Sequence, residues 1–195
     1  MIAKDIQQYL ASPFGCEFDV DIITPSTAKC FQKLLEPLAR LYFVKARYVK
    51  KLVSALIADN KLKPFEFVVK RGFKPEAFMH DSGVMSISYG MFIKTSRWVF
   101  VSVLCHELSH VWLSQQDYYS ELKALNKQFK QQYASVADVE LISPIEVYAR
   151  QVSIAIMEGV LAALTDQWQK DKLLTALGYE REKLIKLENM LSSLQ

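Results

Sequence analysis

The sequence is poor in several features that would indicate particular classes of protein. It has only three cysteines, Cys16, Cys30 and Cys105. An odd number of widely spaced cysteines argues against a disulfide-rich secreted module and favours a reducing compartment. No stretch approaches the roughly 18 to 20 apolar residues that cross a membrane, and the first residues carry no apolar signal segment. The net charge of +3 is too small to indicate nucleic-acid binding. We therefore expect a cytoplasmic protein that binds neither membranes nor nucleic acids.

The length and composition favour a single globular domain over residues 1–195. Hydrophobic residues make up 51% of the chain and charged residues 23%, which is typical of globular proteins. A chain of this length buries roughly 70% of its unfolded surface and needs no disulfide bonds for stability. The periodicity divides it into a helical N-terminal part at 1–60, a core at 61–160 and C-terminal helices at 161–195.

Apolar periodicity predicts an α+β fold that is mostly helical, with a small sheet in the middle of the chain. Helical spacing runs from Thr27 to Asp59, with a break or kink at Pro37. Aromatic and β-branched residues at 65–70 predict one strand, and the alternating segment 83–89 predicts another. Residues 83–89 are our candidate for an exposed edge strand, to which an extended peptide could add.

Further helices are predicted after the two strands. Thr95-Ser96 offers an N-cap for a helix over 97–115, and Ser143-Pro144 opens a helix that continues beyond Glu158. Apolar residues also recur at roughly helical spacing in 117–138. The C-terminal segments 173–177 and 184–194 are amphipathic, and Gly178 is predicted to break the helix between them.

The most specific signal is an H-E-x-x-H motif over residues 106–110. It contains two of the three histidines, His106 and His110, which would be neighbours on one face of a helix. Two imidazoles at that spacing can bind one Zn²⁺ ion at roughly 2.0–2.1 Å each. Glu107 could then act as general base on a zinc-bound water. The alternative is a buried helix whose histidines only form hydrogen bonds. The third histidine, His80, is expected to be an exposed loop residue.

A catalytic zinc ion needs three protein ligands and one open position. No histidine follows His110, so the third ligand should be a carboxylate on a later helix. We choose Glu146, near the start of the helix at Ser143-Pro144. Two other roles would explain Glu146 without a metal: a capping box with Ser143, or an i,i+4 ion pair with Arg150. The alternative carboxylates for the third ligand are Glu158, Glu140 and Glu121.

With these residues the chain resembles the gluzincin class of zinc metallopeptidases, of the compact intracellular kind. Those proteins carry H-E-x-x-H on one helix and a glutamate ligand on a later one, and the resemblance covers about residues 65–160. It implies a zincin-like domain in which His106, His110 and Glu146 hold zinc. One difference is Arg150, four residues after Glu146, because gluzincins often have an acidic residue shortly after the glutamate ligand.

The resemblance implies hydrolysis of peptide bonds in a peptide or protein substrate. Glu107 would take the proton of the attacking water and deliver it to the leaving amine, while zinc polarises the carbonyl. Tyr148, His80 or Arg150 could donate a hydrogen bond to the oxyanion, and the sequence does not select among them. A different class is also open: a metal-binding or partner-binding protein of the same fold that cleaves nothing.

Overall fold

A computed structural model describes residues 20–80, 83–136 and 139–193 of the chain. The described part is mostly helical and contains a three-stranded sheet, so the α+β prediction is confirmed. Cys16 and the rest of the first nineteen residues lie outside it. Among the described residues, no helix is both long and apolar enough to cross a membrane.

The first described helices form an N-terminal unit beside the sheet. Helix α2 (Pro25–Leu35) begins at Thr24, whose side chain accepts a hydrogen bond from the Thr27 N–H in a reciprocal capping box. Pro37 then opens a short 3₁₀ helix, η2 (Pro37–Arg40), before α3 (Tyr42–Ala58). The predicted break at Pro37 is therefore confirmed, since a proline ring does not fit inside a continuous α-helix.

The sheet consists of β1 (Glu66–Lys70), β2 (Ala77–Met79) and β3 (Val84–Ser88), in the order β1-β3-β2. Strand β3 pairs in parallel with β1 and antiparallel with β2. Both predicted strands are present, but the edge assignment of residues 83–89 was wrong, because β3 is the central strand. The edge next to the motif helix is β2, a three-residue strand too short for its alternation to be recognised in the sequence.

The motif helix follows the sheet after one short helix. Ser88 caps α4 (Tyr89–Lys94), and Ser96 caps α5 (Arg97–Ser114) by accepting a hydrogen bond from the Val99 N–H. The predicted helix over 97–115 is confirmed. Most of α5 is buried, including Leu104, Cys105 and Leu108, so the motif lies in a rigid core element.

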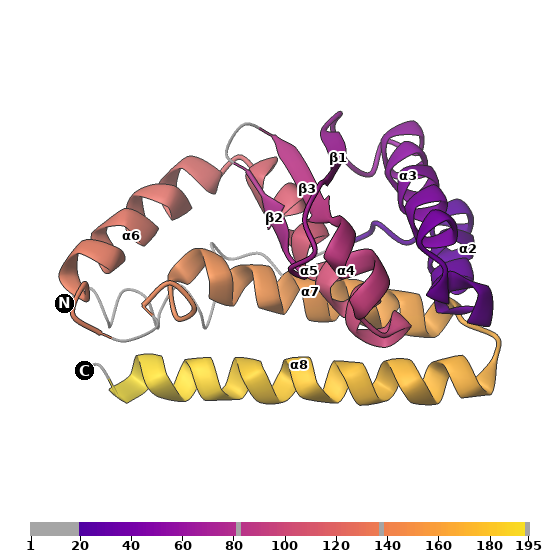
Figure 1. Ribbon diagram of the computed structural model, residues 1–195. Coiled ribbons are helices and arrows are strands. Elements are labelled where there is room, and N and C mark those ends of the chain that lie inside the picture. Colours follow the sequence, from indigo (N-terminus) through magenta and orange to yellow (C-terminus); the bar gives the residue numbers. More distant parts are fainter. Residues whose placement is uncertain (1–19, 81–82, 137–138, 194–195) are drawn as a thin grey trace.

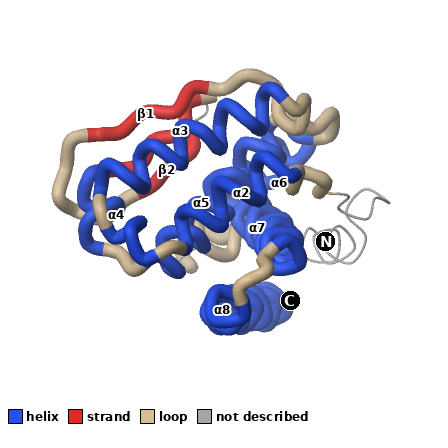
Figure 2. The backbone as a smooth tube through the Cα atoms, turned by 90° about the vertical axis from the view of Figure 1, so that its right-hand side faces the viewer, coloured by secondary structure: helices blue, strands red, loops and turns tan. Residues whose placement is uncertain are grey.

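In the described part of the chain, three helices follow α5. They are α6 (Tyr119–Gln132), α7 (Pro144–Ala163) and α8 (Gln167–Ser193). Helix α7 packs along α5, and α8 runs antiparallel to α7 on the face away from the sheet, as the two perpendicular views show (Figures 1 and 2).

The predicted break at Gly178 was wrong, because α8 is continuous through that position. A Cβ at Gly178 would meet nothing within 4 Å, so the glycine marks neither a turn nor a close approach. Leu173 and Leu177 are buried against the core on the preceding turns. Their packing outweighs the cost of glycine in a helix, which is about 1 kcal/mol relative to alanine.

Candidate metal site

Helix α5 presents both motif histidines to one point. Their Nε2 atoms are 3.2 Å apart, and the ring planes are nearly perpendicular at 87°. The side chains of His106 and His110 are 19% and 16% exposed, so the rings are largely buried, and both residues line a cavity.

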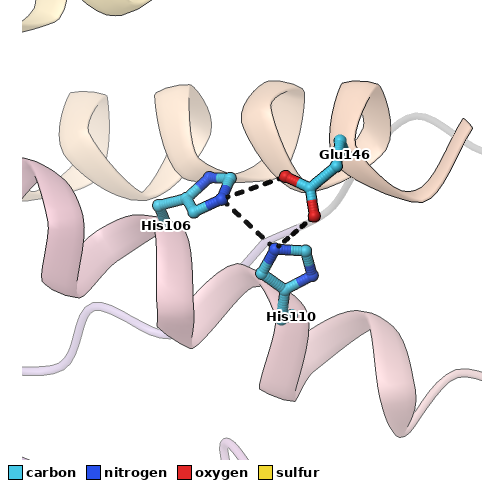
Figure 3. A group of neighbouring side chains, drawn as sticks. All are labelled: His106, His110 and Glu146. Carbon is cyan, nitrogen blue, oxygen red and sulfur yellow. Dashed lines mark hydrogen bonds and ion pairs between the residues drawn. The ribbon is translucent and has the colours of Figure 1, made fainter. Parts of the chain in front are cut away.

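Glu146 completes the group from the first turn of α7. Its Oε2 atom lies 3.3 Å from His106 Nε2, and its Oε1 atom lies 3.4 Å from His110 Nε2 (Figure 3). His106, His110 and Glu146 are the one group of three or more potential ligands that converges within the described ranges. The structure therefore brings together the three residues selected from the sequence.

The two other roles considered for Glu146 are not found. Ser143 is the N-cap residue of α7, but its side chain makes no capping hydrogen bond, so there is no capping box. Asn126 of α6 instead accepts a hydrogen bond from the Ile145 N–H at 3.1 Å. Arg150 pairs with Glu180 of α8 rather than with Glu146. Glu146 is thus held at the helix start by its neighbours' contacts, with its carboxylate directed at the two histidines.

The convergence of these three side chains is compatible with a zinc site. Ligands at roughly 2.0–2.1 Å from a tetrahedral ion lie about 3.3–3.4 Å from one another. The Nε2 atoms of the two histidines are 3.2 Å apart, close to that value. Glu146 reaches His106 with one oxygen and His110 with the other, and with one atom counted from each residue the three ligand atoms lie within 4.8 Å of one another. Two imidazole nitrogens and one carboxylate oxygen are also a ligand set of catalytic zinc sites. In most metal sites the second ring nitrogen of a ligating histidine donates a hydrogen bond. The buried Nδ1 of His106 has no such partner among the described residues.

The carboxylate of Glu146 is ionised in this environment. Burial acts to raise its pKa, but hydrogen bonds and charge interactions with His106 and His110 act more strongly in the opposite direction. The pKa of Glu146 is therefore held well below its usual range. An ionised carboxylate is the form that binds a metal cation.

Glu107 occupies a different environment from Glu146. It is 6% exposed, and burial raises the pKa of its carboxyl above the usual value of 4.5, against smaller lowering effects of His106 and His110. The main-chain N–H of Met79 in β2 donates a hydrogen bond to it. Burial of this kind makes a carboxylate a stronger base, as general acid–base catalysis requires.

These residues open into one cavity of about 900 Å³. Its walls come from β2, α5, α6 and the start of α7. Glu76 and His80 hydrogen-bond β3 through their main chains. Because hydrogen-bonded pairs alternate along an antiparallel ladder, Ala77 and Met79 direct their N–H and C=O groups away from β3. Strand β2 lines the cavity, so this unpaired edge lies beside the histidines.

The competing carboxylates are placed elsewhere. Glu158 pairs with Arg181 on the surface, and Glu121 is exposed on α6. Glu140 lines the cavity but pairs with Lys130. None of the three converges on the motif histidines.

The three candidate oxyanion donors have different surroundings in the structure. His80 lies in the loop after β2, as predicted, but it is half-buried and lines the cavity instead of being exposed. Its Nε2 contacts Ser86 Oγ at 2.9 Å and Lys70 Nζ at 3.0 Å. Tyr148 is fully buried in the core, and Arg150 is engaged with Glu180. Of the three, His80 is the one that reaches the cavity.

Two contributors were not identified from the sequence. Asn126 lies at a buried position of α6 between Leu122 and Phe129, and a polar residue in that apolar stripe was the available signal. The Met79 N–H is a main-chain group, which no side-chain pattern reveals.

No protein-family model matches this chain, and neither the curated proteins nor the solved structures contain a significant match. The case for a metal site therefore depends on the geometry of His106, His110 and Glu146.

Proposed function

We propose that the protein is a zinc-dependent peptidase with a zincin-like arrangement of the gluzincin kind. The observation that carries this proposal is the triangle formed by His106, His110 and Glu146, in which both imidazole Nε2 atoms and the carboxylate converge on one point. A buried glutamate with a raised pKa adjoins the triangle, and the edge of β2 opens into the same cavity.

Bound zinc would supply a Lewis acid that lowers the pKa of water toward about 7 and polarises a carbonyl oxygen. His106, His110 and Glu146 would hold the ion and leave one position open for water and substrate. Glu107 takes the proton of the attacking water at its carboxylate and then delivers it to the amine nitrogen as the peptide bond breaks. The proton gained by Glu107 in the first step is thus lost in the second.

The edge of β2 supports an extended peptide as the substrate. A peptide strand could pair with the outward N–H and C=O of Ala77 and the outward C=O of Met79. The Met79 N–H is already bonded to Glu107, which ties the position of the base to the strand that would hold the substrate. In this proposal β2 has the role that the sequence assigned to residues 83–89.

The proposed location is the cytoplasm. Both described cysteines, Cys30 and Cys105, are buried free thiols, which is compatible with a reducing compartment.

The proposal predicts that Glu107→Gln keeps zinc but loses hydrolysis. The amide cannot accept the proton, so turnover should fall by about 10²–10⁴-fold, while the metal ligands are unchanged. Metal content is measured by elemental analysis of the purified protein, and turnover with a library of fluorogenic peptides. Glu158→Gln is the matched control, since it makes the same change at an exposed residue.

Two results would contradict this mechanism. One is full activity in Glu107→Gln. The other is wild-type protein that holds about one zinc per chain but cleaves no peptide, which would favour the alternative of a metal-binding or partner-binding protein without catalysis.

A further inference from the structure

One wall of the cavity carries a row of lysines. Lys123, Lys127 and Lys130 all line it from α6, at positions i, i+4 and i+7, which lie on one face of a helix. Helix α6 and strand β2 both line the cavity, and α7 runs below them in Figure 1. The row therefore faces the space in which a peptide paired with β2 would lie.

The balance of charge on this wall is positive. Glu140 also lines the cavity and pairs with Lys130, so the described residues of this wall comprise three lysines and one glutamate. On the β2 side, the Lys70 ammonium lies 3.0 Å from His80 Nε2 and adds positive charge beside another lining residue. Glu107 and Glu146 belong to the metal site, where a divalent cation would offset their charge.

The length of the row suits an extended peptide. Seven residues of helix rise about 10.5 Å, at about 1.5 Å per residue. About three residues of extended chain, at roughly 3.3 Å each, cover that distance. Main-chain pairing with the edge of β2 is available to a peptide and not to a nucleic acid, so the two walls together favour a peptide with negative side chains.

We propose that the cavity selects substrates that carry aspartate or glutamate beside the bond to be cleaved, with Lys123, Lys127 and Lys130 as the residues that determine this specificity. The inference rests on the proposed peptidase function and deepens it by naming the substrate class. The lysines act on binding of the substrate and take no part in the proton transfers.

Binding is tested without turnover, using zinc-loaded Glu107→Gln protein and short fluorescein-labelled peptides. Pairs of peptides differ only in that Asp and Glu are replaced by Asn and Gln. Fluorescence anisotropy should show the acidic member binding about five- to tenfold more tightly, as expected for two or three partly exposed charge pairs. The preference should shrink as salt is raised, because exposed charges are screened.

Charge reversal on α6 provides the decisive comparison. In Glu107→Gln protein that also carries Lys123→Glu and Lys127→Glu, the preference should invert, so that peptides with Lys in place of Asp and Glu bind more tightly. Both lysines are exposed and glutamate is a good helix former, so the fold should survive, which circular dichroism checks. Lys172→Glu combined with Lys186→Glu on α8 is the matched control: it changes net charge equally, and the preference for acidic peptides should persist.

Several outcomes would overturn the inference. These are equal binding of the acidic and amide peptides, an unchanged preference after the α6 reversal, and a single-stranded oligonucleotide that binds more tightly than the acidic peptide. A different result would contradict the peptidase proposal. Acidic peptides would then bind with the stated preference to wild-type protein and remain uncleaved, whereas cleavage without any charge preference would refute this inference alone.

Discussion

Lys45 is a charged side chain in the interior, only 1% exposed. Its ammonium donates hydrogen bonds to the carbonyl oxygens of Phe92 and Thr95 at 2.8 and 3.0 Å, and lies 4.8 Å above the Phe100 ring. Lys45 thereby satisfies main-chain acceptors at the end of α4, immediately before the motif helix. Burial, with a smaller contribution from Arg97, lowers the pKa of Lys45 from 10.5 to about 8.

This lowered pKa predicts a distinctive pH dependence of stability. Between about pH 8 and pH 10.5 the unfolded chain holds the Lys45 proton more tightly than the folded one, so the contribution of Lys45 to stability rises with pH in that window. Relative to Lys45→Met, the wild type should gain up to about 3 kcal/mol across it. Urea unfolding of both proteins on either side of the window measures the difference. A difference that stays constant with pH would contradict a strongly lowered pKa.

At the residue scale, the candidate ligands could be predicted from the sequence, but the hydrogen bonds that position them could not. His106 and His110 followed from their spacing, and Glu146 from the need for a third ligand after the last histidine. The capping of α7 by Asn126 did not follow, because that hydrogen bond joins residues 19 positions apart. The local pattern at Ser143 left a capping box open as an alternative, and the structure has this long-range contact in its place.

At the scale of elements, one buried carboxylate joins the two site helices to α8. Glu180 of α8 pairs with Arg150 of α7, accepts a hydrogen bond from Ser102 of α5 at 3.0 Å, and contacts Lys183 at 3.0 Å. Burial acts to raise the pKa of Glu180, but these partners together lower it. Since α5 carries the histidines and α7 carries Glu146, this network helps fix the two helices relative to each other.

Removing the Glu180 carboxylate should lower the free energy of unfolding, and most of the loss should arise because Arg150 is left unpaired. Glu180→Leu leaves the largely buried guanidinium of Arg150 without its carboxylate, and should lower the free energy of unfolding by about 3–5 kcal/mol. Arg150→Met combined with Glu180→Leu should recover most of that loss. Denaturant unfolding of the two single variants and the double variant measures the coupling.

The exposed pair between Glu158 and Arg181 offers a matched control, because it also joins α7 to α8. Glu158→Leu should change the unfolding free energy by no more than about 1 kcal/mol. Equal losses in Glu158→Leu and Glu180→Leu would show that the buried network has no special role in holding the helices.

Long periodic segments explain why several elements could be predicted and others could not. The helix over 27–59 has enough turns for its apolar stripe to be recognised, and Pro37 supplied the break. The helix over 97–115 followed from its N-cap and from the spacing of the motif histidines. Strand β2 has three residues, and its identity depends on pairing with β3. The continuity of α8 through Gly178 depends on packing against α5 and α7, which local propensity does not contain.

At the scale of the whole molecule, the order of the strands and the pairing of helices were not available from the sequence. The central position of β3 arises from a parallel pairing with β1 and an antiparallel pairing with β2. The convergence of α5 and α7 joins residues about forty positions apart, and packing of the entire core selects it. The site is therefore a product of the tertiary fold, and a ligand that bridges α5 and α7 should stabilise that fold.

This coupling predicts that zinc raises the thermal stability of the protein. A ligand bound only by the native state at 100 times its dissociation constant adds about 2.7 kcal/mol. For a chain of this size, that corresponds to roughly 5–11 °C in the unfolding temperature. Differential scanning calorimetry of zinc-loaded and chelator-treated wild-type protein measures the shift.

Two variants decide whether the shift comes from the proposed site. Glu146→Gln removes the ligand supplied by α7 and the charge that attracts the cation, so the zinc-dependent shift should largely disappear. Glu158→Gln makes the same change on the same helix, at a surface residue paired with Arg181, and should keep the shift. If zinc stabilised Glu146→Gln as much as the wild type, the ion would be binding elsewhere. The triangle of His106, His110 and Glu146 would then be a set of polar contacts between two helices, and the peptidase proposal would lose its metal.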